Sequence, residues 1–246
     1  MQNKHLIIHG GSSEISKELM KLFKNEFNEF TIFCRNKKKV DEYIDEIKNE
    51  SIRINIVEID ILHIEKNYLY IEKIKNNISG IIWISGATGN AEQEFLDPIE
   101  GEKNIRINFM NPILIINKII PKMVLDANSF IVALTSVAGV RGRAKQLFYS
   151  SAKAGLISYL SGLRQKLDAK RINVITIIPG YIKTKAFEKG GWKAPSFLIS
   201  SPKKTAKIIY KAVKSKKDIV YISFIWRIIM FFVVHIPEKI FKRLRF

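Results

Sequence analysis

Short apolar runs of strand length recur along this 246-residue chain, separated by segments with helical periodicity. The runs are continuous rather than alternating, which is typical of strands buried on both faces of a parallel sheet. They cover residues 5–9, 30–34, 54–59, 81–85, 130–134 and 174–178. Helical patterns cover residues 15–23, 40–47, 103–120, 151–167 and 202–216. This strand–helix repetition predicts an α/β fold with a doubly wound, mostly parallel sheet of the Rossmann type.

Composition limits the class of protein. The single cysteine, Cys34, excludes an internal disulfide and a multi-cysteine metal site, and no metal-ligand motif is present. The apolar run near the amino terminus is too short for a signal peptide, so we expect a cytoplasmic protein. We expect one Rossmann domain over residues 1–222, followed by an apolar and basic helical tail over 223–246.

The net charge of +18 is unevenly distributed, because residues 201–246 carry 12 basic and two acidic side chains. Such a segment favours a membrane surface, nucleic acid or phosphorylated ligands as partners. The chain has no recognised nucleic-acid motif and no base-stacking aromatics among its lysines, so we expect no nucleic-acid partner.

The first predicted strand leads through Gly10-Gly11-Ser12-Ser13 into a helix. A strand–turn–helix of this kind presents free backbone N–H groups and a positive helix end to an anion such as a pyrophosphate. The second strand ends at Arg35 and Asn36 with no acidic residue. A basic residue there favours NADPH over NADH, because it can meet a 2′-phosphate. The alternatives are an ordinary turn and a solvated, lysine-rich helix start.

The sequence Tyr149-Ser150-Ser151-Ala152-Lys153 follows Ser136 by thirteen residues. On a helix, positions i and i+4 share a face, so Tyr149 and Lys153 can point into the same cleft. A nearby ammonium lowers the pKa of a phenol and makes it usable for proton transfer to a carbonyl group.

With these motifs the chain resembles the short-chain dehydrogenase/reductase family, over residues 4 to about 222. The resemblance implies a catalytic tetrad of Asn108, Ser136, Tyr149 and Lys153. Tyr149 would be the general acid, Lys153 would tune Tyr149 and bind the nicotinamide ribose, Ser136 would bind the carbonyl oxygen, and Asn108 would hold a water. It also implies a set of cofactor-binding residues: Gly10, Ser12, Ser13, Ile15, Arg35, Asn36, Asp60, Ile61, Gly86, Tyr149, Lys153, Pro179, Gly180, Ile182 and Thr184.

The sequence departs from the family pattern at a few positions. Glu14 and Ser16 replace two family glycines, and Ser85-Gly86-Ala87-Thr88-Gly89 replaces Asn-Ala-Gly. A glutamate about 4 Å from a phosphate would cost about 1–4 kcal/mol. We therefore expect the Glu14 side chain to point away from the cofactor. If it does not, cofactor binding would be weakened. The alternative that Glu14 and Ser16 support is a catalytically silent nucleotide-binding protein.

Within the family, the tail and the first turn are most similar to the decaprenylphosphoryl-2-keto-ribose reductase branch. That branch implies a polyprenyl-phosphate-linked keto sugar as substrate, a role in cell-envelope polysaccharide synthesis and a flavin oxidase as partner. The alternative is a soluble reductase of acyl, steroid-like or free sugar ketones.

Residues 219–236 are almost entirely apolar, and Arg227 interrupts them. An arginine at the bilayer centre costs about 2.5–3.5 kcal/mol, which favours shallow insertion in the membrane plane over a spanning helix. We expect a cytoplasmic protein that lies peripherally at the inner face of the membrane. The alternative is a tail that packs on the core or on a partner subunit, and we expect a homo-oligomer. The loop over 185–201 is interpreted as a substrate lid, with Gly190-Gly191 as hinge and Trp192 as a stacking face. The alternative is that Trp192 packs on its own domain.

Overall fold

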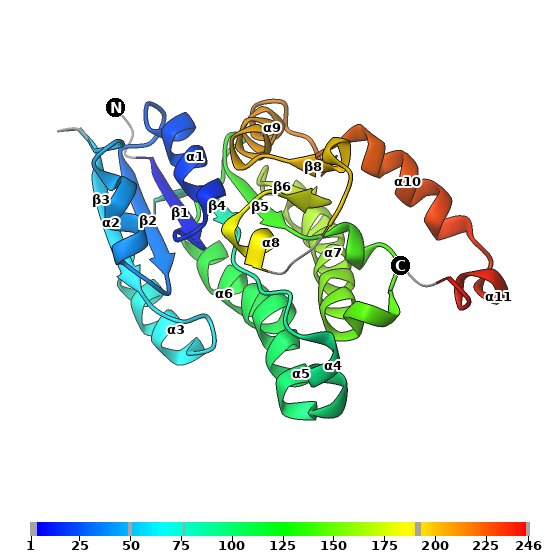
Figure 1. Cartoon of the computed structure of the whole chain (residues 1–246). Helices are drawn as coiled ribbons and strands as arrows, with labels where there is room; N and C mark the ends of the chain where they lie inside the picture. The colour runs from blue at the N-terminus through cyan, green and yellow to red at the C-terminus, as the bar shows by residue number, and fades with distance from the viewer. Residues whose placement is uncertain (1–3, 49–50, 76, 190–192, 245–246) are drawn as a thin grey trace.

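The computed structural model describes residues 4–48, 51–75, 77–189 and 193–244. Its centre is a seven-stranded parallel sheet in the order β3-β2-β1-β4-β5-β6-β9 (Figure 1). The predicted doubly wound α/β fold is therefore confirmed. The strands are β1 (His5–His9), β2 (Glu29–Cys34), β3 (Arg53–Glu58), β4 (Ile78–Trp83), β5 (Phe130–Leu134), β6 (Asn173–Ile178) and β9 (Ile219–Tyr221).

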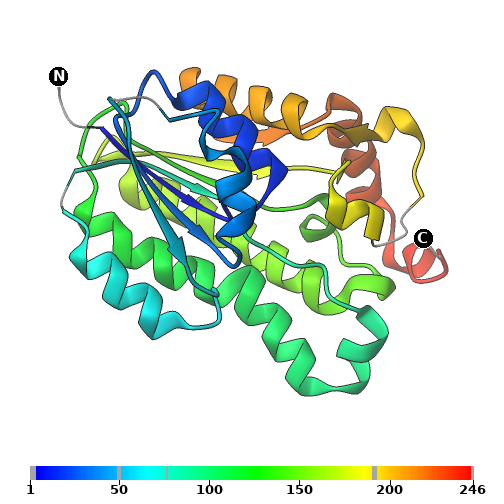
Figure 2. The same cartoon turned by 60° about the vertical axis from the view of Figure 1, so that its left-hand side comes forward.

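Helices cover both faces of the sheet, as Figures 1 and 2 show. One face is covered by α1 (Glu14–Phe23), α2 (Lys38–Ile44) and α9 (Pro202–Lys214). The other face is covered by α3 (Ile64–Lys73), α6 (Asn111–Ile119) and α7 (Leu147–Asp168). Each face buries its own apolar cluster, so the strands are apolar on both sides, as their continuous apolar runs predict.

The fourth strand lies three residues earlier than predicted at its start and ends two residues earlier, at Trp83. Gly80 explains the earlier start. A Cβ on Gly80 would lie 2.6 Å from the ring of Phe130 and 2.7 Å from Leu6, so the close packing there requires glycine inside the strand. The segment after Trp83 still follows the sheet edge, because the N–H groups of Ile84 and Ser85 both donate to the carbonyl of His9.

The helix predicted over 103–120 is not one regular helix. It consists of α5 (Pro98–Ile105), a π-helical turn (Arg106–Met110) and α6. The short α4 (Ala91–Leu96) precedes α5 and was not predicted. A π turn inside a helix commonly marks a functional position, and Asn108 lies at the centre of this one.

The predicted lid segment begins with α8 (Lys185–Lys189) and ends in a short 3₁₀ turn (Ser196–Leu198). It is anchored at both ends, because β7 (Tyr181–Ile182) pairs with β8 (Ile199–Ser200) in a separate two-stranded sheet. The predicted hinge, Gly190-Gly191, and the predicted stacking residue Trp192 lie outside the described residues. Further 3₁₀ turns cover Ile120–Lys122, Val137–Gly139 and Ala144–Gln146.

The tail forms α10 (Phe224–His235) and α11 (Glu238–Phe241), which lie beside the carboxyl end of the sheet (Figure 1). One face of α10 packs through Trp226 and Met230 against Val137 and Ile178. Arg141 holds the other end of the tail, because its guanidinium donates to the carbonyls of Val234 and Ile236 and pairs with Glu238 at 2.6 Å. No helix within the described part of the chain is both long and apolar enough to cross a bilayer.

Candidate active site

A cavity of about 620 Å³ lies at the carboxyl ends of the central strands, where ligands bind in open α/β sheets. Nine of the predicted site residues line this cavity. They are Arg35, Gly86, Ser136, Tyr149, Lys153, Pro179, Gly180, Ile182 and Thr184. These nine residues come from five separate segments of the sequence.

Tyr149 and Lys153 project from the first two turns of α7 into this cavity. The Lys153 ammonium lies 5.8 Å from the centroid of the Tyr149 ring and donates to the carbonyl of Leu134 at 3.2 Å. Lys153 is only 4% exposed, although it is a lysine. A buried lysine with a single carbonyl partner beside a phenol is a typical arrangement for proton transfer.

The electrostatics of the pair differ from the expectation in one respect. The predicted lowering of the Tyr149 pKa is wrong, because desolvation raises this pKa more than Ser136 and Arg143 lower it. Burial lowers the pKa of Lys153 to about 8. Tyr149 is therefore protonated at neutral pH and has a proton to donate, while Lys153 still carries its charge.

Ser136 and Asn108 border the same pair from two sides. The Ser136 hydroxyl accepts from the N–H of Ala138 at 3.1 Å and favours the Tyr149 phenolate. Asn108 is fully buried and does not line the cavity. Its amide donates to the carbonyl of Ala87 at 2.7 Å and accepts from the N–H of the same residue at 3.2 Å.

Gly86 separates Asn108 from the cavity. A Cβ on Gly86 would lie 2.9 Å from the Asn108 amide oxygen and 3.2 Å from the Lys153 ammonium. A larger residue at this position would therefore fill the space between them. The absence of a side chain at Gly86 also allows a flat ring to lie close against the backbone at the end of the strand.

The predicted nucleotide-binding turn lies at the carboxyl end of β1, beyond the residues that line the cavity. Gly10 has a φ of +107°, which only glycine adopts readily, and the Ser13 hydroxyl caps α1 by accepting from the N–H of Ile15. The Ser12 hydroxyl donates to the carbonyl of Asn36 at 3.1 Å. This bond joins the turn to the end of β2, where Arg35 enters the cavity.

Asp60 and Ile61 follow the neighbouring strand β3 and also lie outside the cavity. The Asp60 carboxylate accepts from the N–H of Leu62 at 2.9 Å. The carbonyl of Ile61 accepts from the Asn111 amide at 2.8 Å, which ties the end of β3 to α6. Both residues therefore lie at the same edge of the sheet as the Gly10 turn.

Glu14 and Ser16, the two residues that replace family glycines, both form hydrogen bonds within the protein. The Glu14 carboxylate accepts from the backbone N–H of Lys185 at 3.2 Å, at the start of α8. The Ser16 hydroxyl donates to the carbonyl of Gly10 at 2.7 Å. Glu14 is therefore bound to the lid segment, and Ser16 fixes the turn from within.

Several cavity residues were missed by sequence reasoning. They include Arg143, Lys145 and Gln146 from the loop before α7, and Trp226 from α10. Position in the sequence offered a signal for the first three, because they lie within six residues of Tyr149. No carboxylate lines this cavity among the residues that the structure describes, whereas four cationic side chains do. The cavity is consequently suited to anionic ligands.

Aromatic side chains form one wall of the cavity. The ring of Tyr181 lies 5.7 Å from those of Phe187 and Trp226. The Trp226 indole donates to the carbonyl of Leu198 at 3.0 Å, and a Cβ on Gly180 would lie 1.9 Å from its nitrogen. The tail helix therefore supplies part of the cavity wall and packs against the segment that begins at Pro179.

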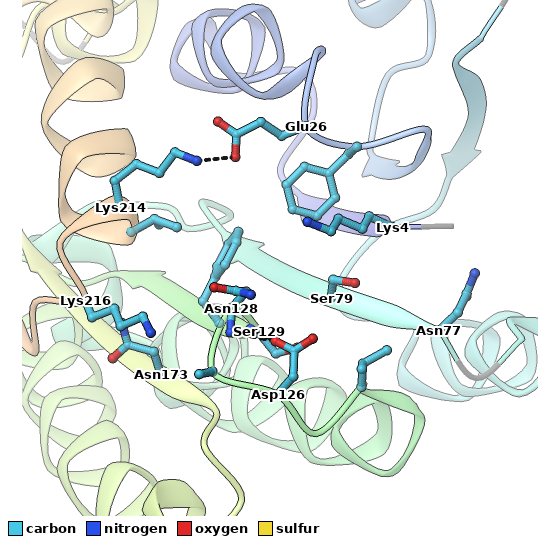
Figure 3. A pocket seen from close by; sticks show the side chains of 15 residues that line it. Lys4, Glu26, Asn77, Ser79, Asp126, Asn128, Ser129, Asn173, Lys214 and Lys216 are labelled. Atoms are coloured by element: carbon cyan, nitrogen blue, oxygen red, sulfur yellow. Dashed lines mark hydrogen bonds and ion pairs between the residues drawn. The ribbon is translucent and has the colours of Figure 1, made fainter. Parts of the chain in front are cut away.

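A second cavity of about 540 Å³ lies at the amino ends of the strands and contains none of the predicted site residues (Figure 3). Lys4, Asp126, Lys214 and Lys216 line it, and Lys214 pairs there with Glu26 at 2.7 Å. It lies at the opposite end of the strands from Tyr149, so it does not contribute to the site described above.

Comparison with known proteins gives a family match over most of the chain. The model of the short chain dehydrogenase family matches residues 4–192. The 3-oxoacyl-(acyl-carrier-protein) reductase of Aquifex aeolicus is 25% identical over 188 residues, which cover 75% of this chain and 76% of that protein. The ketoacyl reductase HetN of a Nostoc species is 34% identical over 107 residues, which cover 43% of this chain and 37% of that protein.

Solved structures share the fold along nearly the whole chain. A short-chain dehydrogenase from Burkholderia cenocepacia, in complex with NADP, has a TM-score of 0.78 at 18% identity and covers 99% of both chains. One from Sphingobium yanoikuyae, in complex with NADPH, has a TM-score of 0.77 at 15% identity and covers 98% of this chain and 96% of that one.

Proposed function

Because the chain belongs to the short-chain dehydrogenase family, we propose that it reduces a ketone to a secondary alcohol with NADPH as the reductant. The observation that carries this proposal is that Ser136, Tyr149 and Lys153 line one cavity at the carboxyl edge of the sheet. A phenol, a hydroxyl and an ammonium in this arrangement can bind a carbonyl oxygen and protonate it.

Each residue of the tetrad then has a defined role. Tyr149 donates its proton to the substrate oxygen, and Ser136 hydrogen-bonds the same oxygen. The Lys153 ammonium stabilises the phenolate that Tyr149 leaves behind and binds the nicotinamide ribose. Asn108 holds a water that connects Lys153 to solvent, and the π turn around it gives the backbone an irregular hydrogen-bonding pattern suited to that role.

The residues present fit a dinucleotide. NADPH, when bound, supplies the hydride for the reduction. Gly86 lines the cavity beside Lys153 without a side chain, which suits the close approach of a nicotinamide ring, and Pro179, Gly180, Ile182 and Thr184 line the same cavity. Arg35 suits a 2′-phosphate, since no acidic residue lines the cavity within the described residues.

The adenosine half would lie beyond this cavity. The Gly10–Ser13 turn and the start of α1 would hold the pyrophosphate, with Ile15 behind them. Asn36, Asp60 and Ile61 would contact the adenosine end. We propose that Glu14 does not contact the phosphates, because its carboxylate accepts from the N–H of Lys185 at the start of α8.

We further propose that the ketone is a keto sugar linked to a polyprenyl phosphate. The aromatic wall of Tyr181, Phe187 and Trp226 suits an apolar sugar face. The outer face of α10 exposes large apolar side chains, among them Phe224, Ile228, Phe231 and Phe232. This face, with the basic residues around it, suits shallow insertion into the inner face of an anionic membrane, where a lipid-linked substrate lies.

The same proposal places the protein in envelope polysaccharide synthesis as a homo-oligomer, with a flavin oxidase that would generate the ketone. The tail would then form a peripheral segment after the Rossmann domain of residues 1–222.

A second candidate function is reduction of a ketoacyl chain. The names of the relatives from Aquifex aeolicus and Nostoc favour it. In that case the exposed face of α10 would contact protein rather than lipid. Comparing turnover on a ketoacyl thioester with turnover on a polyprenyl-phosphate keto sugar separates the two candidates.

The Tyr149→Phe variant tests the reductase activity itself. We expect ketone-dependent oxidation of NADPH to fall by at least a hundredfold, because the general acid is lost. The dissociation constant of NADPH should change by less than about threefold, since the aromatic ring remains. Retained turnover would remove Tyr149 from the mechanism. Tyr159→Phe, on the same helix but hydrogen-bonded to Asn117 outside the cavity, is the matched control.

A further inference from the structure

We propose that Arg143 and Lys145 form an anion subsite that binds a phosphate group of the ketone substrate. The proposal rests on the reductase function above and adds to it the residues that select a phosphorylated ketone. Both residues belong to the loop between β5 and α7, and both line the cavity that contains Tyr149.

The charges of the residues that line the cavity are the first observation that supports an anion subsite. Four cationic side chains line it, Arg35, Arg143, Lys145 and Lys153, and no carboxylate does so among the described residues. Arg35 follows β2 on the nucleotide side, and Lys153 is buried beside Tyr149. Two cations therefore remain on the substrate side without a role in ketone reduction.

The geometry of the loop that contains Arg143 is the second observation that supports this subsite. The Arg143 guanidinium donates to the side-chain oxygen of Gln146 at 2.6 Å, which orients it from within the same short turn. Neither Arg143 nor Lys145 forms an ion pair with any carboxylate in the described part of the chain. An oriented guanidinium with free N–H groups suits the oxygens of a phosphate ester.

The proximity of this subsite to Tyr149 is the third observation that supports it. Arg143 is close enough to Tyr149 for its charge to act on the phenol, so a phosphate held there would lie near the carbonyl that Tyr149 protonates. The aromatic wall borders the same space. A ketone whose phosphate is attached directly to a small sugar would place both groups in this one cavity.

The same loop also contacts the tail. Arg141, two residues before Arg143, holds α10 and α11 through two carbonyls and Glu238, and its guanidinium lies 4.2 Å from the centroid of the Phe241 ring. The proposed phosphate subsite therefore lies next to the part of the protein that exposes an apolar helix face. A phosphate carrying an apolar chain on its far side would leave the cavity toward that face.

Dihydroxyacetone phosphate and dihydroxyacetone are the probes for this subsite, because they differ only in the phosphate. Their binding to the complex of the full-length enzyme with NADP⁺ is measured by calorimetry, and their reduction is measured by steady-state kinetics. We expect the wild-type protein to bind the phosphorylated ketone at least tenfold more tightly. We expect Arg143→Gln with Lys145→Gln to lower this preference by at least tenfold, both in binding and in kcat/KM.

Lys166→Gln is the matched control, because it removes one exposed cation at the far end of α7. It should leave the preference unchanged. A third measurement, the pH profile of kcat/KM for dihydroxyacetone, detects a different role for Arg143. If Arg143 acts only on the pKa of Tyr149, its loss shifts this profile and weakens both ketones equally, which would overturn the subsite.

The outcomes also separate the two proposals. Binding of the phosphorylated ketone that depends on Arg143 and Lys145, without turnover of any ketone, would support the subsite and contradict the reductase function. Turnover of both ketones without any preference for the phosphate would do the reverse. Loss of NADPH affinity in the double variant would assign the two cations to the cofactor and overturn the subsite.

Discussion

At the scale of single residues, the unusual feature of the site is a buried lysine, Lys153, that has no carboxylate partner among the residues that the structure describes. Burial lowers the pKa of Lys153 to about 8, so its charge is lost as the pH rises past that value. The neutral amine no longer stabilises a Tyr149 phenolate. We therefore expect kcat/KM for ketone reduction to fall above about pH 8, measured between pH 6 and 10.

Lys153→Arg provides the comparison for this pH dependence. A guanidinium keeps its charge up to about pH 12, so the alkaline fall should disappear, although overall activity should be lower because the larger group fits poorly beside Gly86. A wild-type profile that stays flat to pH 10 would contradict the assigned role of Lys153.

A second buried titratable residue controls stability rather than chemistry. His9 lies between the rings of Phe33 and Trp83, at centroid distances of 5.3 and 4.0 Å, and burial lowers its pKa to about 4. Between about pH 4 and 6.5 the unfolded chain binds a proton that the folded protein excludes. Lowering the pH through this range should therefore cost about 3 kcal/mol of folding free energy.

Chemical denaturation at pH 7 and pH 4.5 measures this effect, and His9→Gln should remove most of the difference between the two values. His63→Gln, at an exposed position after β3, should leave the difference unchanged. An equal pH dependence in wild type and His9→Gln would assign the acid sensitivity to other groups.

At the scale of elements, the sequence predicts the strands well and the interrupted helix poorly. Strands such as β5 are continuous apolar runs because both faces are buried, and this pattern is visible in one sequence. The break in the helix around Asn108 is not visible in the sequence. Asn108 exchanges two hydrogen bonds with Ala87, 21 residues away, and such a tertiary contact leaves no periodic pattern in the sequence. The glycine requirement at position 80 likewise depends on Phe130.

Likewise, some residues of the site could be predicted from the sequence and others could not. Tyr149 and Lys153 share a helix face, so their spacing alone predicts a common cleft. Trp226 reaches the cavity only because α10 folds back against the segment at Gly180, a tertiary contact between distant parts of the chain. The net direction of the Tyr149 pKa also required the structure, since desolvation outweighs its charged neighbours.

The helix α10 supplies the element-scale prediction, because it has one packed face and one exposed face. Trp226 is 9% exposed and Phe231 is 61% exposed on the same helix. We expect Trp226→Ala to destabilise the packing of the tail by about 3 kcal/mol. We expect Phe231→Ala to change stability by less than about 0.5 kcal/mol.

Limited proteolysis measures this difference, since a detached tail is cleaved faster. Trp226→Ala should also raise KM for the ketone, because the aromatic wall is lost. Equal protease resistance in the two variants would show that the tail is held by Arg141 and its partners instead.

At the scale of the whole molecule, charge and apolar surface occur together in the last part of the chain. The protein carries a net charge of +18, and the outer face of α10 exposes Phe231 and Phe232. We expect the full-length protein to co-sediment with vesicles that contain phosphatidylglycerol, and less with vesicles of phosphatidylcholine alone. Raising the salt concentration should weaken the electrostatic part of this binding.

Phe231→Ser combined with Phe232→Ser should reduce vesicle binding by at least tenfold. Phe95→Ser combined with Leu96→Ser is the control, because these residues of α4 are at least as exposed and α4 lies away from the tail helices (Figure 1). If both double variants bind vesicles as the wild type does, insertion of the exposed face of α10 into lipid is contradicted.

The indole of Trp226 against Gly180 has a practical consequence for anyone who shortens the protein to improve its handling. Ending the chain before Ser223 would remove Trp226 from the wall of the catalytic cavity. It would also expose Val137 and Ile178 to solvent. A trimmed enzyme would then lose turnover even on a water-soluble ketone. Serine replacements on the outer side of the helix keep that wall intact and so separate lipid attachment from chemistry.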